Sequence, residues 1–259
     1  MAIQPAILAP LAPAGHVVTV RMTSPQQGKP LLRLLSGLAV GEGLVVGIGA
    51  HFIQAIGASI PGLSPFPVFS TAEGPLPATQ ADVWFWLRGE SPAEVFARVH
   101  GLVKALPGGL TFVEDQAVFS HSGHGCGHGV AVEAEDPSVA EGPLAGSSFV
   151  AAQRWIHERP GHLEQEPADG LTVRTLGHGS AKDHGVYEAA FTPDLARFEQ
   201  HMLRMVGGDG SEVSSRLQVM RPLTGGYYWC PALVEDRLDL RPILPGGVDA
   251  LPDIAVEGA

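Results

Sequence analysis

Short apolar runs, rich in β-branched and aromatic residues, recur along the whole chain and predict β-strands. The first run, residues 15–22, carries Val17, Val18 and Val20 and contains no proline. The other runs predicted as strands are residues 43–49, 82–88, 110–119, 147–157, 171–176, 184–191 and 225–231. They fall into two similar sets, one in each half of the chain.

Three longer segments with apolar residues at helical spacing separate these strands and predict helices, and a shorter helical stretch is expected at residues 50–56. Residues 29–38 repeat leucine, and residues 91–106 begin with Ser91 as N-cap and Pro92 at the first helical position. The third helix is expected to begin at Pro193 with Thr192 as its cap. Its apolar face is predicted to hold Leu195, Phe198, Met202 and Met205.

Two sets of strands and helices with this spacing predict an α+β protein made of two ferredoxin-like units with antiparallel sheets. We expect the first unit to span residues 1–118 and the second to span residues 119–235. Residues 236–259 are rich in proline, glycine and acids, and we expect an irregular C-terminal tail there.

Composition narrows the class of protein further. The chain has 259 residues, of which 45% are apolar and 17% charged, so it can bury a sizeable core and global disorder is excluded. A net charge of −11 without a basic stripe argues against a nucleic-acid partner. No apolar run reaches about 18 residues, so we expect no membrane span. Only two cysteines and no basic leader segment point to a cytoplasmic location.

One short segment stands out for its chemistry. Residues 120–129 read Ser-His-Ser-Gly-His-Gly-Cys-Gly-His-Gly. Imidazole and thiolate are ligands that zinc and copper prefer, and glycine allows the backbone to turn so that several side chains approach one point. The metal ligands predicted from this segment are His121, His124, Cys126 and His128.

The chain also resembles the dye-decolorising peroxidases, a superfamily of haem enzymes with two ferredoxin-like domains, or dimeric α+β barrel. The matching pieces are residues 4–8, 82–87, 146–150, 153–155 and 222–229. The resemblance implies the same fold and an oxidoreductase activity with a small-molecule substrate. It also implies a homo-oligomer.

The catalytic motifs of that family match less well. Residues 129–133 align with the haem-edge motif, but Val132 stands where the family has an aspartate. Valine cannot transfer a proton. The strand at residues 171–176 matches the one that carries the distal arginine, which makes Arg174 its counterpart. His162 is the nearest candidate for the axial haem ligand, in a connection that is shorter than the family's.

These observations leave three hypotheses. In the first, a non-haem ion, copper in preference to zinc, replaces haem and activates O₂ or peroxide. His157, His162 or His178 then reaches toward the ligands of residues 121–128 from a neighbouring strand. Arg174 positions the oxygen species or an anionic substrate. In the second, the chain is a haem peroxidase with His162 as axial ligand and Arg174 on the distal side. In the third, the chain binds copper or zinc without turnover.

Overall fold

Ten strands of the computed structural model form one sheet that closes into a barrel, and β3–β4 and β13–β14 form two separate pairs. The structure describes residues 1–71, 74–120, 131–133, 135–159, 169–180 and 182–244. Around the ring the strands run β10, β8, β12, β2, β5, β1, β6 and β9, and β9 pairs with β10 to complete the circle. The short strands β7 and β11 pair with β9 and β8, respectively.

The order of the strands confirms the two predicted ferredoxin-like units. The first unit contains β1 (Ala14–Arg21), β2 (Leu44–Ile48), β5 (Val83–Gly89) and β6 (Thr111–Phe119). The second contains β8 (Ser148–His157), β9 (Thr172–Gly179), β10 (His184–Thr192) and β12 (Gly226–Cys230). In both units the fourth strand lies beside the first, followed by the third and the second, which is the ferredoxin-like order. The α+β prediction is therefore confirmed.

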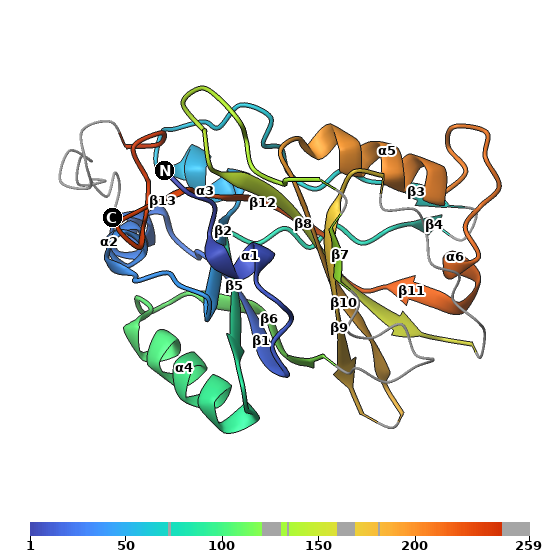
Figure 1. The fold of residues 1–259 in the computed structure, drawn as a ribbon, viewed down its shortest axis with the longest axis horizontal. Coiled ribbons are helices and arrows are strands. Elements are labelled where there is room, and N and C mark those ends of the chain that lie inside the picture. Colours follow the sequence, from blue (N-terminus) through green and yellow to red (C-terminus); the bar gives the residue numbers. More distant parts are fainter. Residues whose placement is uncertain (72–73, 121–130, 134, 160–168, 181, 245–259) are drawn as a thin grey trace, which may run out of the picture.

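Helices cover the outside of the barrel. In the first unit these are α2 (Gly28–Gly37) and α4 (Pro92–Ala105), and in the second it is α5 (Leu195–Met205) (Figure 1). The short elements are α1 (Pro5–Leu8), η1 (Pro25–Gln27), α3 (Ala50–Ala55), β3 (Ser70–Thr71), β4 (Gly74–Pro75), β7 (Ala131–Glu133), α6 (Arg216–Val219), β11 (Met220–Pro222), β13 (Leu233–Val234) and β14 (Arg237–Leu238). No helix within the described ranges is long and apolar enough to span a membrane.

The start of α5 differs from the prediction. Asp194, not Thr192, is the N-cap, and its side chain accepts a hydrogen bond from the backbone N–H of Ala196. Thr192 is still the last residue of β10, and its hydroxyl donates to the carbonyl of Asp194. Aspartate and threonine are both good N-cap residues. Because Thr192 is held in β10, Asp194 takes the N-cap position of α5. The predicted apolar face of α5 is confirmed, because its four residues are all buried.

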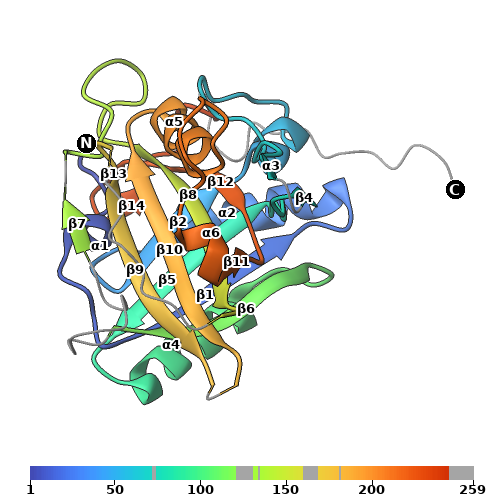
Figure 2. The ribbon, with the colours of Figure 1, turned by 90° about the vertical axis from the view of Figure 1, so that its right-hand side faces the viewer.

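Strand alternation divides the core into two clusters. Successive side chains of a strand point to opposite faces, so each strand contributes to both. The interior of the barrel holds a cluster that includes Trp84, Trp86, Tyr187, Phe191 and Tyr228. The outer faces of the strands pack against the helices in a second, larger cluster. Figure 2 shows α5 and α6 outside the strands of the second unit.

The described part of the predicted C-terminal tail packs on the second cluster. Strands β13 and β14 form a hairpin at residues 233–238. Leu238, Leu240 and Ile243 are buried in the outer cluster. The last strand of the first unit, β6, ends at Phe119, and the two units share the one sheet.

The two units meet at two seams of the barrel, β6 with β9 and β2 with β12, and a side chain closes the second seam. Strands β2 and β12 pair only between Ile48 and Trp229. Beyond that point Gln4 lies between them, fully buried: its Nε2 donates to the carbonyls of Val46 (2.9 Å) and Pro231 (3.1 Å). Its Oε1 accepts from the backbone N–H of Val46 (2.8 Å). The amide thus satisfies backbone groups that would otherwise be buried without partners.

Replacing Gln4→Ala should therefore destabilise the protein by about 3 kcal/mol, since several buried backbone groups lose their partners at once. Urea unfolding followed by circular dichroism measures this loss. Gln26→Ala, at an exposed position on η1, is the control and should change stability by less than about 0.5 kcal/mol. Equal stability of the Gln4 and Gln26 variants would contradict this role.

Candidate functional site

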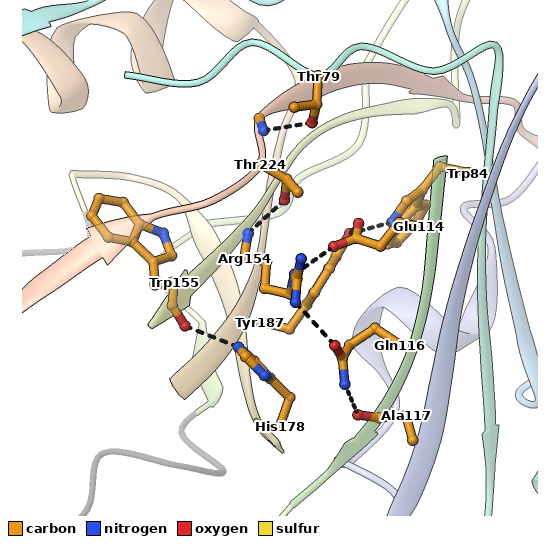
Figure 3. A network of polar contacts seen from close by, with 11 residues as sticks. Thr79, Trp84, Glu114, Gln116, Ala117, Arg154, Trp155, His178, Tyr187 and Thr224 are labelled. Carbon is orange, nitrogen blue, oxygen red and sulfur yellow. Dashed lines mark hydrogen bonds and ion pairs between the residues drawn. The ribbon is translucent and has the colours of Figure 1, made fainter. Parts of the chain in front are cut away.

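A buried carboxylate on β6 is the centre of a polar network inside the barrel (Figure 3). Glu114, Gln116 and Val118 face inward, whereas Asp115 faces outward and is mostly exposed. The side chain of Glu114 is only 7% exposed. Its Oε1 lies 3.0 Å from Nε of Arg154 on β8, so the carboxylate and the guanidinium form an ion pair.

Neighbouring groups hold the arginine in place. Nη1 of Arg154 donates to Oε1 of Gln116 (3.2 Å), and the backbone N–H of Arg154 donates to the hydroxyl of Thr224 (2.9 Å). The side chain of Arg154 is 28% exposed, against 7% for Glu114 and 1% for Tyr187. The network therefore runs from the dry interior of the barrel toward solvent.

On the buried side, Glu114 meets a tyrosine. The hydroxyl of Tyr187 on β10 donates to Oε2 of Glu114 (3.3 Å) and accepts from the indole N–H of Trp84 (2.9 Å). Trp84 stacks on Tyr228 with a centroid separation of 6.1 Å, and Trp86 lies 6.4 Å from Trp84. These rings form a contiguous group of oxidisable side chains next to one carboxylate.

Burial sets the protonation of this pair. Desolvation raises the pKa of Glu114 above its ordinary value, although the charge of Arg154 and the hydrogen bond from Tyr187 act in the opposite direction. Burial also raises the pKa of Tyr187 well above its ordinary value, and the neighbouring Glu114 charge adds to this shift. Tyr187 therefore keeps its proton near neutral pH, and Glu114 is a stronger base than an exposed carboxylate. The pair can accept or release one proton at a site screened from water.

The predicted distal arginine faces the interior of the barrel. Arg174 on β9 is fully buried, and its Nε donates to the carbonyl of Ile7 on α1 (3.0 Å). In the pairing of β7 with β9, Ala131 lies opposite Arg174 and Val132 lies opposite Val173. Directly opposed residues share a face of the sheet. The position of the family's aspartate and Arg174 therefore lie on opposite faces.

His157 and His178, the two predicted metal ligands that lie on described strands, point to opposite faces of the sheet. His178 points inward and is buried, with Nε2 2.9 Å from the carbonyl oxygen of Trp155. His157 lies on the outer face of β8, where its ring is 5.2 Å from that of His184. Burial lowers the pKa of both His157 and His178, so each is neutral near neutral pH.

The remaining predicted site residues lie outside the described residues: His121, His124, Cys126, His128 and His162. Within the part of the chain that the structure describes, no three His, Cys, Asp or Glu side chains gather in a way that would hold a metal ion.

The fold has well-defined relatives among solved structures. No family model matches the chain. DyPB from Rhodococcus jostii superposes with a TM-score of 0.74 at 20% identity, covering 89% of this chain and 96% of that one. The encapsulated DyP-type peroxidase from Mycobacterium smegmatis superposes with a TM-score of 0.70 at 21% identity, covering 89% of this chain and 96% of that one.

The chain has the fold of the dye-decolorising peroxidases. A Rhodococcus jostii DypB variant in complex with haem also matches, with a TM-score of 0.73 at 19% identity over 90% of this chain and 97% of that one. Another variant of DypB was solved in complex with manganese. The resemblance drawn from the sequence is thus confirmed as a likeness of fold to the dye-decolorising peroxidases.

The polar network inside the barrel was not predicted from the sequence. Glu114, Arg154 and Tyr187 stand on predicted strands, and period-two alternation assigns each one a face. It does not say which strands meet across the barrel. The one available signal was Glu114 itself, a charged residue at an inward-facing position of a strand.

The raised pKa of Glu114 predicts a pH-dependent contribution to stability. The folded protein retains the carboxyl proton at pH values where the unfolded chain has released it. This contribution is therefore complete below the ordinary pKa of 4.5 and is lost as the pH rises through the raised pKa. Measured by urea unfolding at a series of pH values, the stability of the wild type should fall relative to Glu114→Gln across this window.

Glu141→Gln is the matched control, because Glu141 is exposed. Its stability should stay parallel to that of the wild type at every pH. A constant difference between wild type and Glu114→Gln over the same pH range would show that the burial of Glu114 does not perturb its titration.

Proposed function

We propose that this chain is an oxidoreductase of the peroxidase type, which oxidises a small molecule at the expense of a peroxide, with haem as the expected cofactor. The observation that carries the proposal is the superposition on DyPB over 96% of that protein's length. The similarity to a haem complex of a variant of that protein favours haem over copper as the first cofactor to test.

The described residues do not fit the distal half of a haem site in this family. A peroxidase distal side needs a proton-transferring group close to a fixed cation. Val132 offers no proton, and Arg174 lies on the opposite face of the sheet, bound to the carbonyl of Ile7. Slow turnover with peroxide is therefore expected. The predicted axial ligand, His162, lies outside the described residues.

What the described residues support is the movement of one electron and one proton within the barrel. A phenol that loses one electron becomes a strong acid, so a buried tyrosine is oxidised readily only when a base accepts its proton. Oε2 of Glu114 already accepts the hydrogen bond of Tyr187, and Arg154 holds the carboxylate in position. Trp84, which donates to the oxygen of Tyr187, is a second oxidisable group in direct contact.

Oxidation through a histidine-bound transition ion is a second candidate function. The observation that favours it is the close approach of His157 and His184 on the outer face of β8 and β10. This candidate corresponds to the copper-dependent oxidoreductase; a carrier would bind the ion without turnover.

The cofactor decides between the two candidates. Protein purified from cells supplied with haem should show a strong Soret band, about one haem per chain, and slow peroxide-dependent oxidation of a reducing dye. His162→Ala should lose the Soret band and the turnover together. His100→Ala, which changes an exposed histidine on α4, should behave like the wild type.

A colourless protein that contains about one transition ion per chain and consumes O₂ or peroxide would favour the second candidate. Absence of both haem and peroxide-dependent oxidation would overturn the proposed peroxidase function.

A further inference from the structure

Histidines on two neighbouring strands stand side by side on the outer face of the second unit. His184, the first residue of β10, lies opposite Gly179 of β9. In the antiparallel pairing of β10 with β8, Gly185 lies opposite Ile156. The adjacent residues, His184 of β10 and His157 of β8, therefore lie opposite each other. Opposed residues of antiparallel strands share a face, with Cβ atoms about 5 Å apart. The two imidazoles therefore point to the same side of the sheet.

The separation of the rings matches a shared metal ion. Their centroids are 5.2 Å apart, and the ring planes differ by 34°. A bond of about 2.0–2.1 Å from imidazole nitrogen to metal places two rings on one tetrahedral ion with their centroids roughly 5 Å apart. The pair is thus already at the spacing of coordinated imidazoles, before any ion binds.

The next position in the same row carries sulfur. Met220 of β11 lies opposite His157, on the side away from His184. The row therefore reads Gly179, His184, His157 and Met220 across four adjacent strands. Thioether sulfur selects copper, above all Cu(I), whereas imidazole binds copper and zinc alike.

The charges around the pair allow a cation to bind. Arg216 of α6 is the cation that acts on His157, and its charge opposes metal binding. Its Nη1 is paired with Glu188 at 2.8 Å, which compensates much of that charge. His157 is half-buried and His184 is exposed, so an ion reaches the pair from solvent without unfolding of the sheet.

We propose that His157 and His184 form a binding site for a copper ion, with the thioether of Met220 as a third ligand that favours Cu(I). The site uses no residue of 121–128 and needs no haem, so it stands apart from the proposed peroxidase function. The ligand class is a soft or borderline transition ion, and copper ranks highest in intrinsic affinity for such a set.

The test is a copper titration of the purified full-length chain after removal of bound metal by a chelator. Cu(II) binding is followed by the rise in melting temperature and by electron paramagnetic resonance, and Cu(I) binding by competition with a chromogenic chelator. His157→Ala and His184→Ala should each weaken Cu(II) binding at least tenfold. His51→Ala, at an exposed position on α3, should bind like the wild type.

Two further variants separate the possible sources of binding. Cys126→Ser should leave the copper affinity unchanged, and Met220→Leu should weaken binding of Cu(I) more than that of Cu(II). Copper binding that survives His184→Ala but is lost in Cys126→Ser would assign the ion to residues 121–128 and overturn the proposal. An unchanged Cu(I) affinity in Met220→Leu would remove the thioether from the site.

A Soret band and peroxide turnover that are equal in His184→Ala and wild type would show that the copper site is independent of the peroxidase activity.

Discussion

Closure of the barrel is the constraint on which the rest of the structure depends. The sheet joins the two units at two seams, β6 with β9 and β2 with β12, and the second seam has a single paired position. The amide of Gln4 completes it by binding Val46 on one side and Pro231 on the other. A closed ring keeps water from the interior, and the raised pKa of Glu114 follows from that exclusion.

The same sheet offers two chemical environments, one on each face. Along β8, Arg154 points inward to Glu114, and His157 points outward to His184. The interior is dry and aromatic, and places Glu114 as a base that can accept the proton of Tyr187 when an oxidant removes an electron from the phenol. The outer face packs against helices over most of its area, but solvent reaches it at His184, where we propose that a copper ion binds. One strand with period-two alternation thus serves both environments.

The fold could be predicted from the sequence further than the site could. Apolar runs of strand length and the Ser91 cap are local signals, and the ferredoxin-like units follow from their order. The interior network depends on which strands meet: Glu114, Arg154 and Tyr187 come from three strands distant in sequence, and no local pattern encodes that meeting. His157 was predicted as a ligand, but its closeness to His184 was not predicted, because the register between β8 and β10 creates the pair.

The most direct test of the account is electron paramagnetic resonance of the cofactor-loaded protein, frozen within milliseconds of mixing with hydrogen peroxide. The account predicts a tyrosyl radical signal in the wild type that is lost in Tyr187→Phe and diminished in Glu114→Gln, since the phenol then lacks a base for its proton. Tyr228→Phe, which changes a neighbouring ring without a bond to Glu114, is the control and should keep the signal. A radical of equal intensity in the wild type and Tyr187→Phe, or none in any variant of a protein that turns over peroxide, would contradict the account.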